Sequence, residues 1–160
     1  MDTIISYVAL ENVFTCCFVC CLVRHCYTDF KEMLLYDSIN LVLLCLGLVR
    51  AVLRAEIGNA LAGMLVLGGL MLLIYWLARG GMGEGDVKLA AVLGLWLGVE
   101  QGLVGLLLAF ISGAIFGLLL LFRSKASAEH VLPFGPFLCL GAVISCFFGN
   151  ELLSWYGQFF

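Results

Sequence analysis

The feature that most constrains this chain is a series of apolar stretches separated by short polar segments. Of the 160 residues, 64% are hydrophobic and 12% are charged, whereas a soluble domain has roughly 45–50% apolar and about 25% charged residues. Because this excess is too large for a buried core, lipid must solvate much of the surface. We therefore expect an all-α polytopic membrane protein with about six transmembrane helices, forming a single membrane-embedded domain over residues 1–160. The apolar stretches are 4–23, 38–53, 57–77, 87–99, 103–122 and 131–148.

The charges near the ends of these stretches predict an orientation. With six spans, Arg50 and Arg54 fall on one side and six basic residues on the other. The side with more basic residues is expected to be cytoplasmic, which predicts a multi-pass protein of the inner (plasma) membrane. Asp2 and Glu11 replace the basic region of a signal peptide, so we interpret the first stretch as a spanning helix. The six basic residues are Arg24, Lys31, Arg79, Lys88, Arg123 and Lys125.

Neither cysteine content nor net charge indicates a further ligand. Cys17 and Cys20 form a CxxC pair, but a zinc site needs a second pair of ligands and a polar surrounding shell. All eight cysteines lie in or beside apolar segments, where free cysteine packs as a small hydrophobic side chain. We expect no disulfide framework and no metal. The formal net charge of −3 argues against a nucleic-acid partner.

The segment GGMGEGDVKL, residues 80–89, differs from the apolar sequence around it. Its glycines, among them Gly83 and Gly85, permit a tightly bent backbone or the close approach of another chain. Irregular backbone at membrane depth occurs where it lines a wet cavity or is covered by protein. The segment lacks the GxxxxGK[ST] pattern of a phosphate loop, and Glu84 and Asp86 repel phosphate. We therefore predict a water-filled pocket that contains the Asp86 carboxylate.

A second aspartate, Asp29, is expected at the same membrane face. It follows the first apolar stretch, whereas Asp86 precedes the fourth, and the two stretches between them cross the membrane twice. Ionisable groups at the edge of a membrane span are functional candidates. Two adjacent carboxylates share a proton, so that one activates water while the other hydrogen-bonds a carbonyl. The expected helix ends favour Asp86 as the base and Asp29 as the acid. A transporter's proton site and a structural role are the alternatives, and Asp37 is typical of a helix cap.

Three blocks of the sequence resemble the prepilin peptidases, the type IV leader peptidase family of membrane aspartic proteases. GEGDVKL, residues 83–89, is similar to the GxGDxKL motif of that family. Upstream, Asp29 stands in D-x3-MLLYD, which is similar to the family's D-x3-MLLPD. Downstream, LPFGPFLCLGA, residues 132–142, resembles PFGPFLALGA. A single GxGD motif is weak, but three blocks in the family's order cover nearly the whole chain.

The resemblance implies that Asp29 and Asp86 are the catalytic pair. It further implies cleavage of the short basic leader from type IV prepilin or pseudopilin precursors, after a glycine, at the cytoplasmic face. An acidic mouth would attract such a leader, and glycines would leave room for the substrate's glycine, while its apolar stem would lie among the spans in the lipid bilayer. Aspartic chemistry needs no cofactor. The residues expected to bind substrate are Gly83, Gly85, Glu84, Lys88, Glu32 and Asp37.

The sequence departs from the family pattern in two places. Tyr36 replaces the usual proline, and Tyr36-Asp37 resembles the YD pair of presenilin-type proteases, which makes Asp37 the rival to Asp29. The zinc-binding domain of larger members has no counterpart, so neither zinc nor N-methylation is assigned. The main alternative is a small proton- or ion-coupled transporter, and a third is a catalytically inactive assembly factor. Trp76, Trp96 and Trp155 are expected at the membrane interface.

Overall fold

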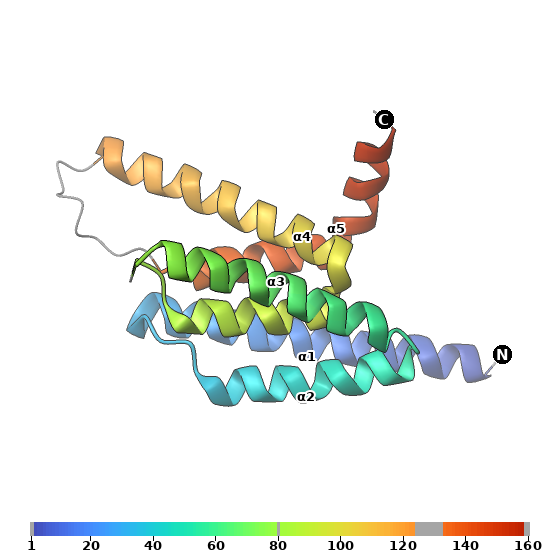
Figure 1. Cartoon of the computed structure of the whole chain (residues 1–160). Helices are drawn as coiled ribbons and strands as arrows, with labels where there is room; N and C mark the ends of the chain where they lie inside the picture. Colours follow the sequence, from blue (N-terminus) through green and yellow to red (C-terminus); the bar gives the residue numbers. More distant parts are fainter. Residues whose placement is uncertain (1, 80, 124–132, 159–160) are drawn as a thin grey trace.

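The structure, a computed structural model, describes residues 2–79, 81–123 and 133–158. All regular structure in these ranges is helical (Figure 1). The all-α fold predicted from the sequence is therefore confirmed. The helices are α1 (Asp2–Glu32), α2 (Asp37–Leu53), α3 (Ile57–Leu77), α4 (Glu84–Arg123) and α5 (Gly135–Gly157).

Helix α4 is two helices joined at Gly98. This glycine has φ 74° and ψ −171°, a conformation that interrupts the helix and that side chains other than glycine rarely adopt. Figure 1 shows the second part, 99–123, running back toward the end at which the first part, 84–97, began. Counting these two parts separately, the described residues form six helical segments, in agreement with the six apolar stretches of the sequence.

Four helices in the described part of the chain are long and apolar enough to cross a membrane, by length and composition. They are α1, α3, α4 and α5, and α2 is shorter, with 17 residues. Several boundaries differ from the sequence prediction, most of all two helix ends. Helix α1 continues beyond residue 23 to Glu32, and α5 continues beyond residue 148 to Gly157.

The first part of α4 lies at the centre of the bundle. Its buried side chains include Leu89, Leu93 and Trp96, which pack in one cluster with Phe18 of α1 and other apolar residues. The rings of Phe18 and Trp96 stack with centroids 4.6 Å apart, and the Trp96 indole N–H donates to the Leu43 carbonyl at 2.8 Å. Packing therefore encloses the Trp96 ring, which does not face lipid as the ring of a membrane-interface anchor would. This enclosure also explains how a short apolar segment is accommodated: neighbouring helices shield it from lipid.

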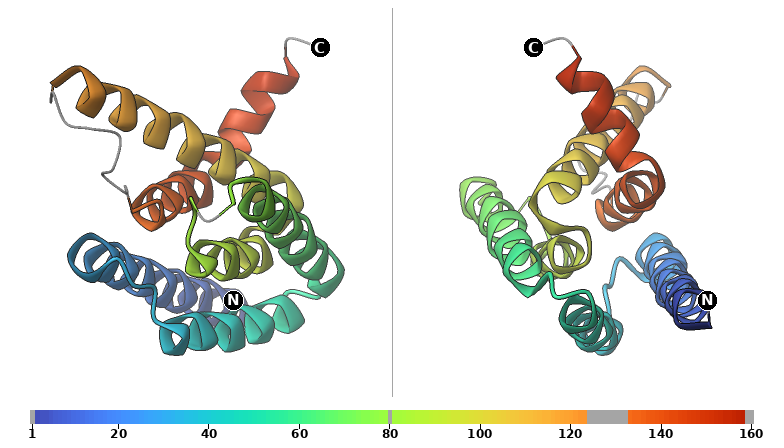
Figure 2. Two further views of the ribbon diagram at one scale, coloured as in Figure 1. Left: turned by 60° about the vertical axis from the view of Figure 1, so that its left-hand side comes forward. Right: turned by 90° about the vertical axis from the view of Figure 1, so that its right-hand side faces the viewer.

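Glycine contacts bring the helices close to α4. A methyl group on Gly63 of α3 would overlap the backbone of Gly94, and one on Gly141 of α5 would overlap that of Gly105. Such glycines let helix backbones approach closely in membranes. Five helix ends gather at one end of the bundle (Figures 1 and 2). They are the ends of α1 and α3 and the starts of α2, α4 and α5.

Candidate active site

A cavity of about 430 Å³ lies at this end of the bundle. Asp29 and Asp86 both line it, as do Gly83 and Gly85 of the segment that was predicted to form a pocket. The structure thus brings together the two aspartates that the sequence placed at one face. The remaining lining residues are Met33, Leu34, Leu35, Gly81, Met82, Glu84, Pro133 and Phe134.

Asp86 lies in the first turn of α4. The helix begins at Glu84, earlier than the start at residue 87 expected from hydropathy, so that Asp86 is inside it. Its backbone N–H donates to the Gly83 carbonyl at 3.2 Å, and its carboxyl lies beside the Gly83 backbone N–H. An acidic residue that reaches back to the start of its own helix forms half of a capping box. The carboxyl is therefore held at the positive end of a helix.

Asp29 lies in the last turn of α1, which continues through it to Glu32. Helix α1 ends at Met33, whose φ of 52° is left-handed and whose N–H donates to the Asp29 carbonyl at 3.0 Å. The Asp29 carboxyl faces the amino end of α5, where a Cβ on Gly135 would stand 2.5 Å from Asp29 Oδ2. Only glycine therefore leaves room for this carboxyl, and the PFGPF block has a positional role beyond beginning the helix.

The two carboxyls are buried, and no cation among the described residues is paired with them. Asp29 is 5% exposed and Asp86 6%, and the two are close enough to repel each other when both are ionised. No Lys or Arg in residues 2–79, 81–123 and 133–158 forms an ion pair with either of them. Asp29 Oδ2 also meets no hydrogen-bond partner among these residues. Two buried carboxyls without counter-ions are suited to share a proton.

The other predicted substrate-binding residues divide into two groups. Gly83, Glu84 and Gly85 line the cavity, whereas Glu32, Asp37 and Lys88 are not among its lining residues. Lys88 Nζ donates to both Asp37 carboxylate oxygens at 2.9 Å. Asp37 is therefore the partner of Lys88, and the helix-cap role predicted for it is wrong, because Tyr36 occupies the cap position of α2 and no side chain caps that end.

Glu32 also has a partner outside the cavity. The Tyr36 hydroxyl donates to Glu32 Oε2 at 2.6 Å, and this hydrogen bond, reinforced by the carboxylate's charge, raises the pKa of Tyr36. Tyr36 stands where the resembling family has proline, so the substitution adds a contact across the turn between α1 and α2. Within the cavity, Glu84 accepts a hydrogen bond from the Tyr75 hydroxyl at 3.2 Å.

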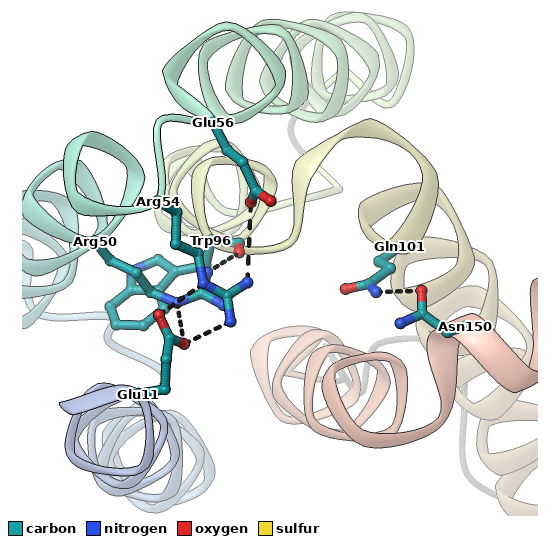
Figure 3. A network of polar contacts seen from close by, with 7 residues as sticks. All are labelled: Glu11, Arg50, Arg54, Glu56, Trp96, Gln101 and Asn150. Atoms are coloured by element: carbon teal, nitrogen blue, oxygen red, sulfur yellow. Dashed lines mark hydrogen bonds and ion pairs between the residues drawn. The ribbon is translucent and has the colours of Figure 1, made fainter. Parts of the chain in front are cut away.

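A second polar region lies at the opposite end of the bundle (Figure 3). Arg54 donates to both oxygens of Glu11 at 2.6 and 2.7 Å, and Arg50 donates to Glu11 at 3.4 Å. Arg50 also donates to the Trp96 carbonyl at 2.9 Å, a group that the break at Gly98 leaves without its helical donor. About five turns of α1 separate Glu11 from Asp29, roughly 27 Å at 1.5 Å per residue.

This distal region holds the break in α4 in place. The Val99 N–H, which begins the second part of α4, donates to Asn59 Oδ1 at 3.3 Å, while Arg50 caps the first part through Trp96. Further along, the Gln101 amide donates to Asn150 at 2.8 Å. Two cavities of about 300 and 360 Å³ border these side chains. The charged residues of this region are visible in the sequence, but no sequence pattern predicts that Glu11 pairs with Arg50 and Arg54.

The fold and the site define a polytopic helical protein with a pair of buried carboxyls at one cavity, the kind of group that is a functional candidate in a membrane protein. The sequence profile of the type IV leader peptidase family matches residues 16–118. The chain belongs to that family. The match includes both aspartates, the glycine-rich segment and the break at Gly98. No solved structure matches the chain.

Curated relatives agree with this assignment. The chain is 42% identical over 130 residues to a prepilin leader peptidase/N-methyltransferase of Burkholderia pseudomallei (strain 1026b), covering 76% of the chain and 42% of the relative. Proteins with the same name from Legionella pneumophila and Aeromonas salmonicida (strain A449) are 34% and 38% identical over 81% and 84% of the chain. The chain spans less than half the length of these relatives, 48% and 49% for the last two.

Proposed function

We propose that this chain is a membrane aspartic endopeptidase that removes the basic leader peptide from type IV prepilin or pseudopilin-like precursors. The observation that carries the proposal is the pair of buried carboxyls, Asp29 and Asp86, which line one cavity and form no ion pair with a described Lys or Arg. The names of the relatives, prepilin leader peptidase/N-methyltransferase, support the substrate class. We assign no methyl transfer, and we treat residues 1–160 as one membrane-embedded domain.

In the proposed mechanism the two carboxyls share one proton. The ionised member removes a proton from a water molecule, and this water attacks the scissile carbonyl carbon. The protonated member donates its proton toward the carbonyl oxygen, which gives a tetrahedral intermediate. Transfer of a proton to the leaving amine then breaks the carbon–nitrogen bond.

We modify one detail of the acid–base assignment made from the sequence. That assignment placed Asp86 at the amino end of a helix and Asp29 near the carboxyl end of another. Asp29 also faces the amino end of α5 at Gly135, so the helix ends no longer distinguish the two carboxyls. We therefore propose that Asp29 and Asp86 titrate jointly and share one proton. Asp86 is the base when the proton is on Asp29, and Asp29 is the base when the proton is on Asp86.

The substrate is proposed to enter from the cytoplasmic side, where the larger set of basic residues predicts the aspartate end to lie. Glu84 lines the cavity and gives its mouth an acidic group that favours a basic leader, whereas the Asp37 carboxylate is paired with Lys88. Gly83 and Gly85 line the cavity without side chains, which supports cleavage after a small residue such as glycine.

Ion or proton transport is the weaker alternative. The distal cavities contribute polar groups at the other end of the bundle, as a transporter requires. Between the two ends, however, lie buried apolar side chains such as Leu22, Leu89 and Leu93. This packing favours a peptidase whose chemistry is confined to one end.

The test is a cleavage assay with the purified chain in detergent or lipid. Its substrate is a prepilin-like peptide with a basic leader that ends in glycine, followed by an apolar stem. Mass spectrometry should show a single cut after the glycine. A matched peptide with leucine in place of that glycine should be cut at least about tenfold more slowly, since differential fit at one side chain is worth 1–3 kcal/mol. An intact first peptide in the presence of the folded protein would reject the proposal.

A further inference from the structure

Two buried polar side chains in the helix ends near the aspartates, His25 of α1 and Asn40 of α2, have no part in the proposed chemistry. His25 of α1 has an exposed fraction of 0%, and Asn40 of α2 one of 6%. Among the described residues, neither ring nitrogen of His25 and neither polar atom of Asn40 meets a hydrogen-bond partner of good geometry. Because an unpaired buried polar group lowers stability, nearly all such groups in folded proteins have a partner. These four atoms therefore require an explanation.

The two side chains lie next to each other across the contact between α1 and α2, near enough to interact. Turning an asparagine amide over, or moving the proton between the ring nitrogens of a histidine, exchanges donors and acceptors with almost no change in position. One such exchange lets the Asn40 amide donate to a His25 nitrogen, or lets the His25 N–H donate to Asn40 Oδ1. A direct hydrogen bond between them is thus the simplest way to pair both groups.

The position of this pair relates it to Asp29. His25 precedes Asp29 by four residues on α1, a spacing that puts two side chains on one face of a helix. Asn40 lies three residues after Asp37 in the first turn of α2. Asp37 in turn binds Lys88 of α4, two residues beyond the other aspartate.

Helix α2 therefore contacts both helices that bear the aspartates, α1 and α4, although it contains neither aspartate. The His25–Asn40 pair joins it to α1, and the Asp37–Lys88 pair joins it to α4. The first of these contacts is buried and the second is exposed. A buried hydrogen bond is held more rigidly than an exposed ion pair, because solvent does not compete for its groups.

We propose that His25 and Asn40 are positioning residues, whose hydrogen bond fixes the end of α1 against α2 and so sets the Asp29 carboxyl relative to Asp86. The inference rests on the proposed function. A displacement of a reacting group by about 1 Å costs up to roughly 100-fold in rate. Loss of the pair should therefore lower kcat, whereas a buried pair with only a structural role would change stability alone.

A double-mutant cycle tests the proposal, with His25→Leu, Asn40→Leu and the double variant. Thermal unfolding, kcat and KM are measured for each, with the prepilin-like peptide as substrate. Each single variant leaves one buried polar group unpaired, so its unfolding temperature should fall, and the double variant should recover most of that loss. The kcat of the double variant should stay about tenfold or more below that of the wild type, while its KM is unchanged.

Two further variants sharpen the result. His25→Gln keeps a side chain that can hydrogen-bond Asn40, and it should retain more of the wild-type kcat than His25→Leu. Ser145→Ala removes another buried hydrogen bond, to the Gln101 carbonyl at 2.5 Å, far from the aspartates. It should lower the unfolding temperature without changing kcat. If a single Leu variant does not fold, the double variant and His25→Gln carry the comparison.

A double variant with wild-type kcat would overturn the inference, as would stability losses of the two single variants that simply add. Failure of the wild type to cleave the peptide is a different result, which would reject the proposed function. In that case the unfolding measurements still show whether His25 and Asn40 interact.

Discussion

Each end of this bundle contains carboxylates, but the carboxylate at the distal end is paired with arginines and the two buried aspartates at the other end are not paired with cations of the described residues. At the distal end, Glu11 lies between Arg50 and Arg54, and its carboxylate accepts hydrogen bonds from both (Figure 3). At the other end, Asp29 and Asp86 are more deeply buried, and no cation among the described residues pairs with them. A buried carboxylate without a counter-ion is costly.

This difference separates a region that stabilises the fold from one that is available for chemistry. The Glu11 network satisfies its charges and, through Arg50, caps the broken helix at Trp96, while Asn59 binds the Val99 N–H. The aspartate pair lines a cavity, and Asp29 Oδ2 meets no hydrogen-bond partner among the described residues. Substitutions at the distal end should therefore lower stability, and substitutions at the aspartate end should lower activity.

Outside the two aspartates themselves, the largest effect is expected from Gly135→Ala at the start of α5. The added methyl group would stand 2.5 Å from Asp29 Oδ2 and 3.1 Å from its Cγ, so the carboxyl must move. We expect the cleavage rate to fall roughly 100-fold, the cost of misplacing a reacting group, while the unfolding temperature changes little. Gly157→Ala is the matched control, because a Cβ there meets nothing within 4 Å. Equal rates for the two variants would contradict the role assigned to Gly135.

A smaller effect, on stability, is expected from Glu11→Gln at the distal end. This change removes the charge that both Arg50 and Arg54 bind, and a hydrogen bond to a charged group is worth about 1.5–3 kcal/mol. The free energy of unfolding in detergent should fall by about 2 kcal/mol, with the cleavage rate within about threefold of the wild type. Loss of cleavage with unchanged stability would show that the two ends are not separate in function.

The smallest effect is expected from Asp37→Asn, which breaks the exposed ion pair with Lys88. The two side chains are 69% and 52% exposed, and such pairs contribute about 1 kcal/mol or less. Stability and cleavage rate should both stay close to wild type, and Lys88→Met should behave in the same way. An inactive Asp37→Asn would instead support the rival reading, in which Asp37 and not Asp29 is the catalytic partner of Asp86.

Much of the site could be predicted from the sequence, because its signals are local. The apolar stretches located the helical segments, and their number placed Asp29 and Asp86 at one end. The glycines around Asp86 indicated a cavity, which the structure contains. These features depend on composition and spacing along the chain, and they need no knowledge of which helices touch.

Features that depend on long-range packing could not be predicted in this way. Met33 ends α1 in a left-handed conformation without the glycine that usually marks such an end. Trp96 is enclosed by Phe18 and Leu43, and Gly98 breaks α4 because Asn59 and Arg50 satisfy the groups that the break exposes. The burial of His25 likewise depends on how α1 meets α2.

The measurement that tests the central claim most directly compares wild type, Asp29→Asn and Asp86→Asn in the prepilin-peptide cleavage assay, with thermal unfolding recorded for each. If the two carboxyls act as one catalytic pair, each variant should lose roughly 10⁴-fold or more in rate. Neither should be less stable than wild type, since each change removes a buried charge that has no counter-ion among the described residues. Substantial cleavage by either folded variant would contradict the two-aspartate account.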